Sequence, residues 1–223
     1  MARVLWAAAA LAAAALLAGC GSSSKSPTGP GQANPPPATQ NRAPVVSGIT
    51  INPPSGFQDR TQFTFSANAS DPDGDTLTYT WNIAGNPASG QTVTMAFTTG
   101  GEGTATVTVS DGKGATATAS QAFTVATMTG TWTGEGPWGP FTMTLTQAAG
   151  FIKGTYTDAI GTAEVGPTGE IGTIDNSGNV SLRVKQAPFA DFRMTGVLEG
   201  NGRRVTGTVS GSGAQGVPFV MMK

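Results

Sequence analysis

Residues 62–69 read QFTFSANA, and residues 77–83 read LTYTWNI. In both stretches apolar and polar side chains alternate, so that Phe63 and Phe65 fall on the same face. Successive side chains of a β-strand point to opposite faces, so this period of two predicts strands that bury one face only. Trp81, in the middle of the second stretch, is predicted to lie at the centre of the core.

The same alternation recurs at residues 93–97, 105–109 and 115–125, with turn residues between the runs. Runs of this length are typical of short antiparallel strands. We therefore expect residues 44–126 to form an Ig-like β-sandwich.

Residues 127–223 carry a denser series of short runs, such as FTMTL at 141–145 and VSLRV at 180–184. Spacings of about 8–12 residues leave no room for crossover helices, so neighbouring strands are predicted to pair as an up-and-down meander. Eight such strands close readily into a barrel, which also removes exposed edges. The predicted fold class is all-β: the sandwich, then a small eight-stranded antiparallel β-barrel.

The composition excludes several functions. The 223 residues include 12 basic and 13 acidic side chains, a net charge of −1, which gives no basic footprint for nucleic acid. The chain has no His, so His-based triads and zinc sites are excluded, and its single Cys cannot form an internal disulfide. We predict no catalytic residues and no enzyme activity.

The N-terminus predicts a targeting segment. A short positive region at residues 1–3 precedes an apolar run from Val4 to Leu17, which is shorter than the roughly 20 residues that a membrane-spanning helix needs. Residues 1–19 are therefore predicted to be a secretory signal peptide.

The end of this segment, LAGC at residues 17–20, resembles the lipobox of bacterial lipoproteins. The resemblance implies cleavage before Cys20, a diacylglycerol on its sulfur and an acyl chain such as palmitate on the new N-terminus. Gly21 follows, where an Asp would favour the inner membrane, so the implied location is the outer membrane, either surface-exposed or periplasmic. The alternatives are an ordinary signal peptide with an incidental Cys and an uncleaved anchor.

Residues 20–43 contain almost no apolar side chains after the Cys and are rich in Ser, Gly and Pro. Such a segment has nothing to bury, so it is predicted to be a disordered, lipidated tether between the membrane and the folded domains.

The sandwich region carries NRAPVV at 41–46, ASDPDGD at 69–75 and VTVSDGKG at 107–114. Together these segments resemble a PKD domain or a related cadherin-like Ig module. Residues 81–86 read WNIAGN, where PKD domains usually have WDFGDG, which leaves the subfamily open. The resemblance implies an extracellular spacer, or a unit for adhesion or carbohydrate contact.

One acidic turn has the composition of a metal site. Asp71, Asp73 and Asp75 alternate around Gly74, and calcium prefers six to eight oxygen ligands. Related modules bind calcium at such turns with an Asp from a neighbouring loop, for which Asp111 is the candidate. The alternative is a plain hairpin turn, because Asp and Gly also favour turns without a metal.

The barrel region has GTW at 130–132 and IKGTYT at 152–157, which weakly resemble lipocalin- and avidin-like barrels. Trp132, Trp138 and Tyr156 are the candidate ligand-binding residues. Trp138 lies in a Gly- and Pro-rich loop and is either a lid tucked onto the barrel, which we favour, or an exposed contact.

Lipocalins also place a late-strand Arg near the Trp, and Arg203 and Arg204 both qualify.

The predicted function is that of an envelope-anchored lipoprotein whose barrel, filled by side chains, contacts protein or polysaccharide through its outer surface. The alternative is a lipocalin-like carrier with a cavity for a small ligand. Calcium is the single cofactor considered, and the membrane is the partner through the lipid on Cys20.

Overall fold

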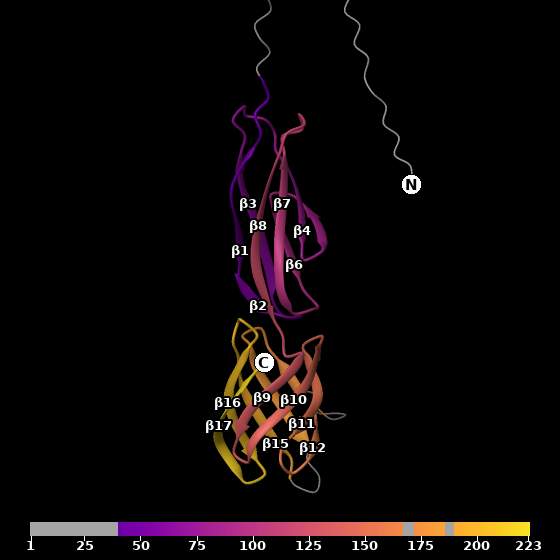
Figure 1. The fold of residues 1–223 in the computed structure, drawn as a ribbon, viewed down its shortest axis with the longest axis vertical. Helices are drawn as coiled ribbons and strands as arrows, with labels where there is room; N and C mark the ends of the chain where they lie inside the picture. Colours follow the sequence, from indigo (N-terminus) through magenta and orange to yellow (C-terminus); the bar gives the residue numbers. More distant parts are fainter. Residues whose placement is uncertain (1–39, 167–171, 186–189) are drawn as a thin grey trace, which may run out of the picture. The chain divides into compact units, whose positions relative to one another are not determined.

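The structure is a computed structural model that describes residues 40–166, 172–185 and 190–223, and every regular element in these ranges is a β-strand (Figure 1). The predicted signal peptide, Cys20 and the tether up to residue 39 lie outside the described residues. In the described part of the chain, no helix is long and apolar enough to cross a membrane.

Two sheets form the sandwich. One has the strand order β1-β3-β6, and the other has the order β2-β8-β7-β4-β5. The strands are β1 (Val45–Asn52), β2 (Ser55–Phe57), β3 (Gln62–Ser70), β4 (Thr78–Ile83), β5 (Asn86–Ser89), β6 (Thr92–Ala96), β7 (Gly101–Ser110) and β8 (Thr116–Ala126).

The alternating runs provide the sandwich core. Phe63 and Phe65 of β3 are fully buried and meet the aromatic rings of the opposite sheet, with Phe65 and Phe123 in a T-shaped contact at 5.2 Å between ring centroids. Trp81 is 3% exposed, and its indole N–H donates to the carbonyl oxygen of Gly90. The predicted central position of Trp81 is confirmed.

Three strands of the sandwich lie outside the predicted runs: β1, which pairs with β3, and the short strands β2 and β5. β2 follows Pro53 and Pro54 and pairs in parallel with the end of β8, and β5 pairs with β4 through a tight turn. β2 reads SGF and β5 reads NPAS, and neither sequence alternates apolar and polar side chains, so the pattern contains no signal for β2 and β5.

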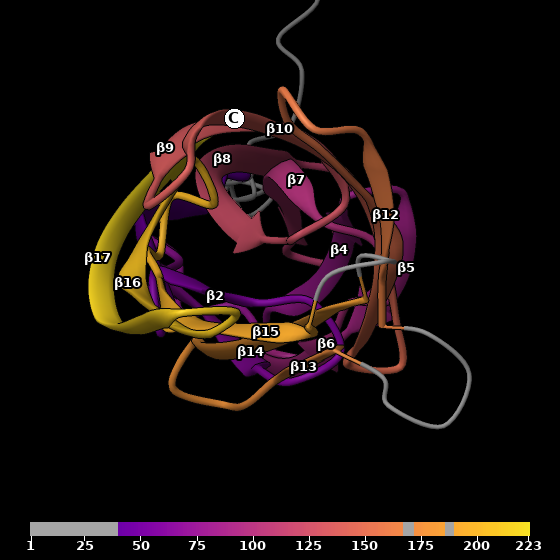
Figure 2. The same cartoon turned by 90° about the horizontal axis from the view of Figure 1, so that it is seen from below.

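The C-terminal strands close into an antiparallel barrel, seen as a ring in Figure 2. Each strand pairs with its successor, except that β12 and β13 do not pair with each other, and the last strand pairs with the first. The strands are β9 (Gly130–Gly136), β10 (Gly139–Ala148), β11 (Phe151–Thr157), β12 (Thr162–Val165), β13 (Gly172–Ile174), β14 (Asn179–Lys185), β15 (Phe192–Leu198), β16 (Arg204–Gly211) and β17 (Ala214–Met222). Because β12 and β13 both lie between β11 and β14, nine segments make an eight-stranded wall. The predicted meander is confirmed.

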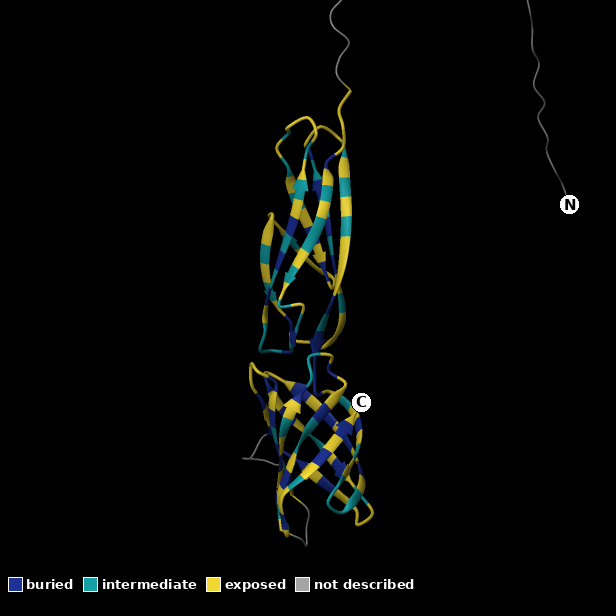
Figure 3. Cartoon of the chain, turned by 90° about the vertical axis from the view of Figure 1, so that its left-hand side faces the viewer, coloured by how far each residue is buried: buried dark blue, intermediate teal, exposed yellow. Residues whose placement is uncertain are grey.

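Buried and exposed residues alternate along the barrel strands (Figure 3). The inward side chains form one apolar cluster that includes Met143, Leu182 and Phe219. Where β10 and β11 approach most closely, the inward position is Gly154, opposite Leu145. A Cβ at Gly154 would overlap the backbone carbonyl of Thr144.

We predict that Gly154→Ala destabilises the barrel by about 1–3 kcal/mol, because the added methyl group overpacks a close backbone contact. Gly48→Ala in β1 is the matched control, since a Cβ there meets no atom within 4 Å. Thermal unfolding should show a clear loss for the first variant and little change for the second. Equal melting temperatures for both variants and the wild-type protein would contradict the close approach.

Residues of the sandwich and of the barrel form a buried polar cluster near the connection between β8 and β9. Gln58 and Gln147 are each 4% exposed, and the side chain of Gln147 donates to the Gln58 carbonyl oxygen at 3.0 Å. Thr127 donates to the side-chain oxygen of Gln58 at 2.6 Å. These bonds satisfy groups that would be costly to bury unpaired.

Candidate functional site

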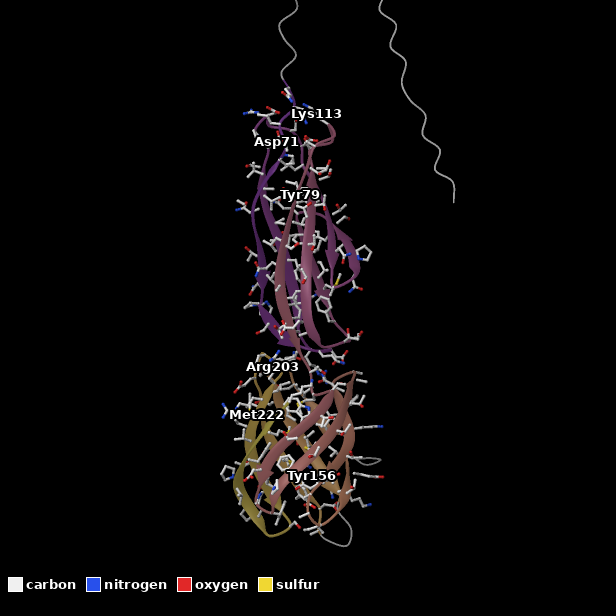
Figure 4. The ribbon with its side chains drawn as sticks, viewed as in Figure 1. Asp71, Tyr79, Lys113, Tyr156, Arg203 and Met222 are labelled. Carbon is white, nitrogen blue, oxygen red and sulfur yellow. The ribbon has the colours of Figure 1, made fainter. Side chains whose placement is uncertain are left out.

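The acidic residues converge at one end of the sandwich. Asp71 follows the last residue of β3, Asp111 follows the last residue of β7, and Asp75 lies in the loop before β4. One carboxylate oxygen from each of the three lies within 4.8 Å of the others. Asp71 and Lys113 are labelled at this end of the sandwich in Figure 4.

In Asp71 and Asp111, one carboxylate oxygen accepts hydrogen bonds from the backbone of the residue's own turn. Oδ1 of Asp71 accepts the backbone N–H groups of Asp73 and Asp75, at 2.8 and 3.2 Å. Oδ1 of Asp111 likewise accepts the N–H groups of Lys113 and Ala115, at 2.8 and 3.1 Å. One oxygen of each side chain therefore shapes its own turn, and the Oδ2 atom is left for another partner.

Asp73 takes a different role from the predicted one. Its carboxylate accepts the backbone N–H of Arg42 at 2.7 Å and forms an ion pair with the Arg42 guanidinium at 2.8 Å. The guanidinium also donates to the Pro72 carbonyl oxygen. The hydrogen bonds from Arg42 lower the pKa of Asp73. The structure thus brings together three of the four predicted residues and directs Asp73 toward Arg42.

Two side chains, those of Asn41 and Lys113, contact carboxylate oxygens of this group. The side-chain amide of Asn41 donates to Oδ2 of Asp111 at 2.6 Å, and this bond lowers the pKa of Asp111. The Lys113 ammonium lies 2.6 Å from Oδ1 of Asp75, and this contact raises the pKa of Lys113.

Two oxygens of the group are buried without a hydrogen-bond partner: Oδ2 of Asp71 and Oδ2 of Asp75. Buried anionic oxygens without a donor are costly unless a cation compensates them. Three converging carboxylates on Gly-containing turns supply the oxygen ligands that calcium prefers. The group therefore fits calcium, and Asp71, Asp75 and Asp111 are the residues that would hold it.

We predict that calcium raises the melting temperature of the wild-type protein and that Asp75→Asn abolishes this shift. At about 100 times its dissociation constant, a ligand stabilises the folded state by about 2.7 kcal/mol, which corresponds to several degrees. Asp73→Asn is the matched control, because it also removes one acidic charge from the same turn but leaves the three converging carboxylates. Retention of the shift by Asp73→Asn and its loss in Asp75→Asn, measured by calorimetry, is the expected pair of results. An equal loss in both variants would contradict the assignment.

Two of the three candidate ligand-binding residues of the barrel, Trp132 and Tyr156, lie in its apolar interior. Trp132 is fully buried, and its indole N–H donates to the Met128 carbonyl oxygen at 2.8 Å. The cation near its ring is not Arg203 or Arg204 but Lys223, whose ammonium lies 5.4 Å from the ring centroid. Partial burial lowers the pKa of Lys223. The sequence contained no signal for this contact, because Lys223 follows the last strand by one residue.

Tyr156 and Trp138 belong to one aromatic cluster. The rings of Tyr156 and Phe141 stack at 5.3 Å, and Phe192 contacts both Tyr156 and Trp138, at 5.3 and 4.9 Å. Burial, and then the charge of Asp158, raise the pKa of the Tyr156 phenol. Trp138 is partly buried against the core, the tucked position that we favoured. Ligand binding by these residues stays a prediction.

This fold is an Ig-like PKD domain followed by a closed eight-stranded antiparallel β-barrel, and residues 41–126 match the family model of the PKD domain. Such a match fits a non-catalytic binding or structural module. The PKD1 domain of Vibrio anguillarum Epp is similar, with 28% identity over 39% of this chain and 96% of that chain, at a TM-score of 0.33.

A second solved structure, from work on the promiscuous specificity of carbohydrate-binding modules of the β-sandwich superfamily, is 16% identical. It covers 82% of this chain and 90% of that chain, at a TM-score of 0.39. No curated protein matches this chain.

Proposed function

We propose that this protein is an envelope-anchored bacterial lipoprotein of the outer membrane, a non-catalytic binding or structural module. Cys20 carries the lipid, the residues between Cys20 and the PKD domain form the tether, the PKD domain acts as a spacer and the barrel makes contact with protein or polysaccharide. The match of residues 41–126 to the PKD family is the main support for the proposal, because a PKD domain fits a spacer or binding role and not a catalytic one. The lipid anchor is supported by the LAGC sequence at residues 17–20.

The outer surface of the barrel supports a contact role. A groove of about 510 Å³ lies over β13, β14 and β15, and hydroxyl, amide and carboxylate side chains line it together with the half-exposed Val197. The polar lining residues are Thr173, Asp175, Asn179, Ser181 and Thr195. Several hydrogen-bonding groups beside an apolar side chain suit a neutral polar ligand such as a polysaccharide.

The anchor is tested with Cys20→Ser. Expressed in a bacterium fed radiolabelled palmitate, the wild-type protein should carry the label and fractionate with the outer membrane. Cys20→Ser should lose the label because it lacks the acylated sulfur, and Ser22→Ala, two residues away, is the control. Label or detergent-phase partitioning in Cys20→Ser equal to that of the wild-type protein would contradict the anchor.

A second candidate function is a small-ligand carrier, favoured by the aromatic cluster of Trp138, Tyr156 and Phe192 at the barrel interior. Native mass spectrometry of the detergent-purified chain after incubation with an envelope extract separates the two functions. We expect no discrete small-molecule adduct, because the inward side chains form one buried apolar cluster. An adduct that Tyr156→Ala abolishes would establish the carrier instead.

A further inference from the structure

The calcium group already contains a cation of its own. The Lys113 ammonium pairs with one of the three carboxylates of the group, that of Asp75. Arg42 pairs with Asp73 and therefore neutralises a carboxylate outside the group. The carboxylates of Asp71, Asp75 and Asp111 carry a formal charge of −3, of which one ammonium neutralises one unit and one divalent cation would neutralise two.

We propose that Lys113 is a resident counter-ion which calcium must displace, and that Asn41 stays at the site and becomes a further ligand. This inference rests on the calcium site of Asp71, Asp75 and Asp111 described above. It assigns opposite effects on calcium affinity to two side chains of this site: Lys113, which contacts Asp75, and Asn41, which contacts Asp111.

The chemistry of the two side chains separates their roles. An ammonium group has three donors and no acceptor, so Lys113 cannot coordinate a metal and repels it electrostatically. An amide has an oxygen beside its nitrogen, so half a turn of the Asn41 amide presents an acceptor where a donor now contacts Asp111. The amide oxygen of Asn is a known type of calcium ligand.

The structure leaves Lys113 free to withdraw. Its side chain is 59% exposed, whereas that of Asp75 is 13% exposed. The Lys113 backbone is held separately, through its N–H group on Asp111. Release of the ammonium therefore breaks one ion pair, of which only the Lys113 side is exposed, and leaves the hairpin in place.

Isothermal titration of calcium chloride into the full chain in detergent tests the proposal. Lys113→Gln should bind calcium about tenfold more tightly than the wild-type protein, because one nearby positive charge is removed. Asn41→Ala should bind several-fold more weakly. Lys153→Gln removes the same charge from an exposed position on β11 and should leave the affinity unchanged.

A second measurement needs no variant. Amine-reactive labelling of the wild-type protein, followed by peptide mass spectrometry, should show faster modification of Lys113 when calcium is present, with Lys153 unchanged. Calcium binding without this increase, or with equal affinity in Lys113→Gln and the wild-type protein, overturns the role of Lys113 while the calcium site stands. Failure of Lys113→Gln and of the wild-type protein to bind calcium overturns the site itself.

Discussion

Both domains depend on the burial of one face of each strand. With only 11% charged residues, this chain covers its outward faces mainly with Thr, Ser and other small polar side chains. These side chains bond to neighbouring strands, as where Thr80 donates to the carbonyl oxygen of Thr108. The inward faces carry nearly all the large apolar groups. Burial of that face fixes the register of each strand, since a slip of one residue would exchange the two faces.

This constraint explains why the sequence predicted the architecture well. Residues 62–69 and 180–184 show the period of two clearly, and both became strands with the expected face buried. β2 and β5 escaped prediction because their sequences do not alternate apolar and polar side chains. The sequence has separate runs at 164–165 and 170–174, but it does not show that β12 and β13 share one wall position between β11 and β14.

The candidate site was predictable only in part. The acidic composition of residues 71–75 pointed to a metal, and the loop containing Asp111 was correctly chosen as the neighbour. The partners of these carboxylates could not be read from the sequence. Arg42 lies 31 residues from Asp73, and Asn41 lies 70 residues from Asp111. The first contact requires β1 to pair with β3, and the second requires the two sheets to pack. The fold therefore decides which carboxylates converge at the candidate site and which one pairs with Arg42.

We propose that the loops at one end of the sandwich bind a cation and that the outer surface of the barrel binds a partner. The central proposal is that Asp71, Asp75 and Asp111 hold calcium at the end of the PKD domain. A crystal structure of the protein grown with calcium, with anomalous data, tests it most directly. We predict an anomalous peak about 2.3–2.6 Å from Oδ2 of Asp71 and Asp75, with the Lys113 ammonium withdrawn. An ammonium still on Asp75, with no peak among the three carboxylates, would contradict the account.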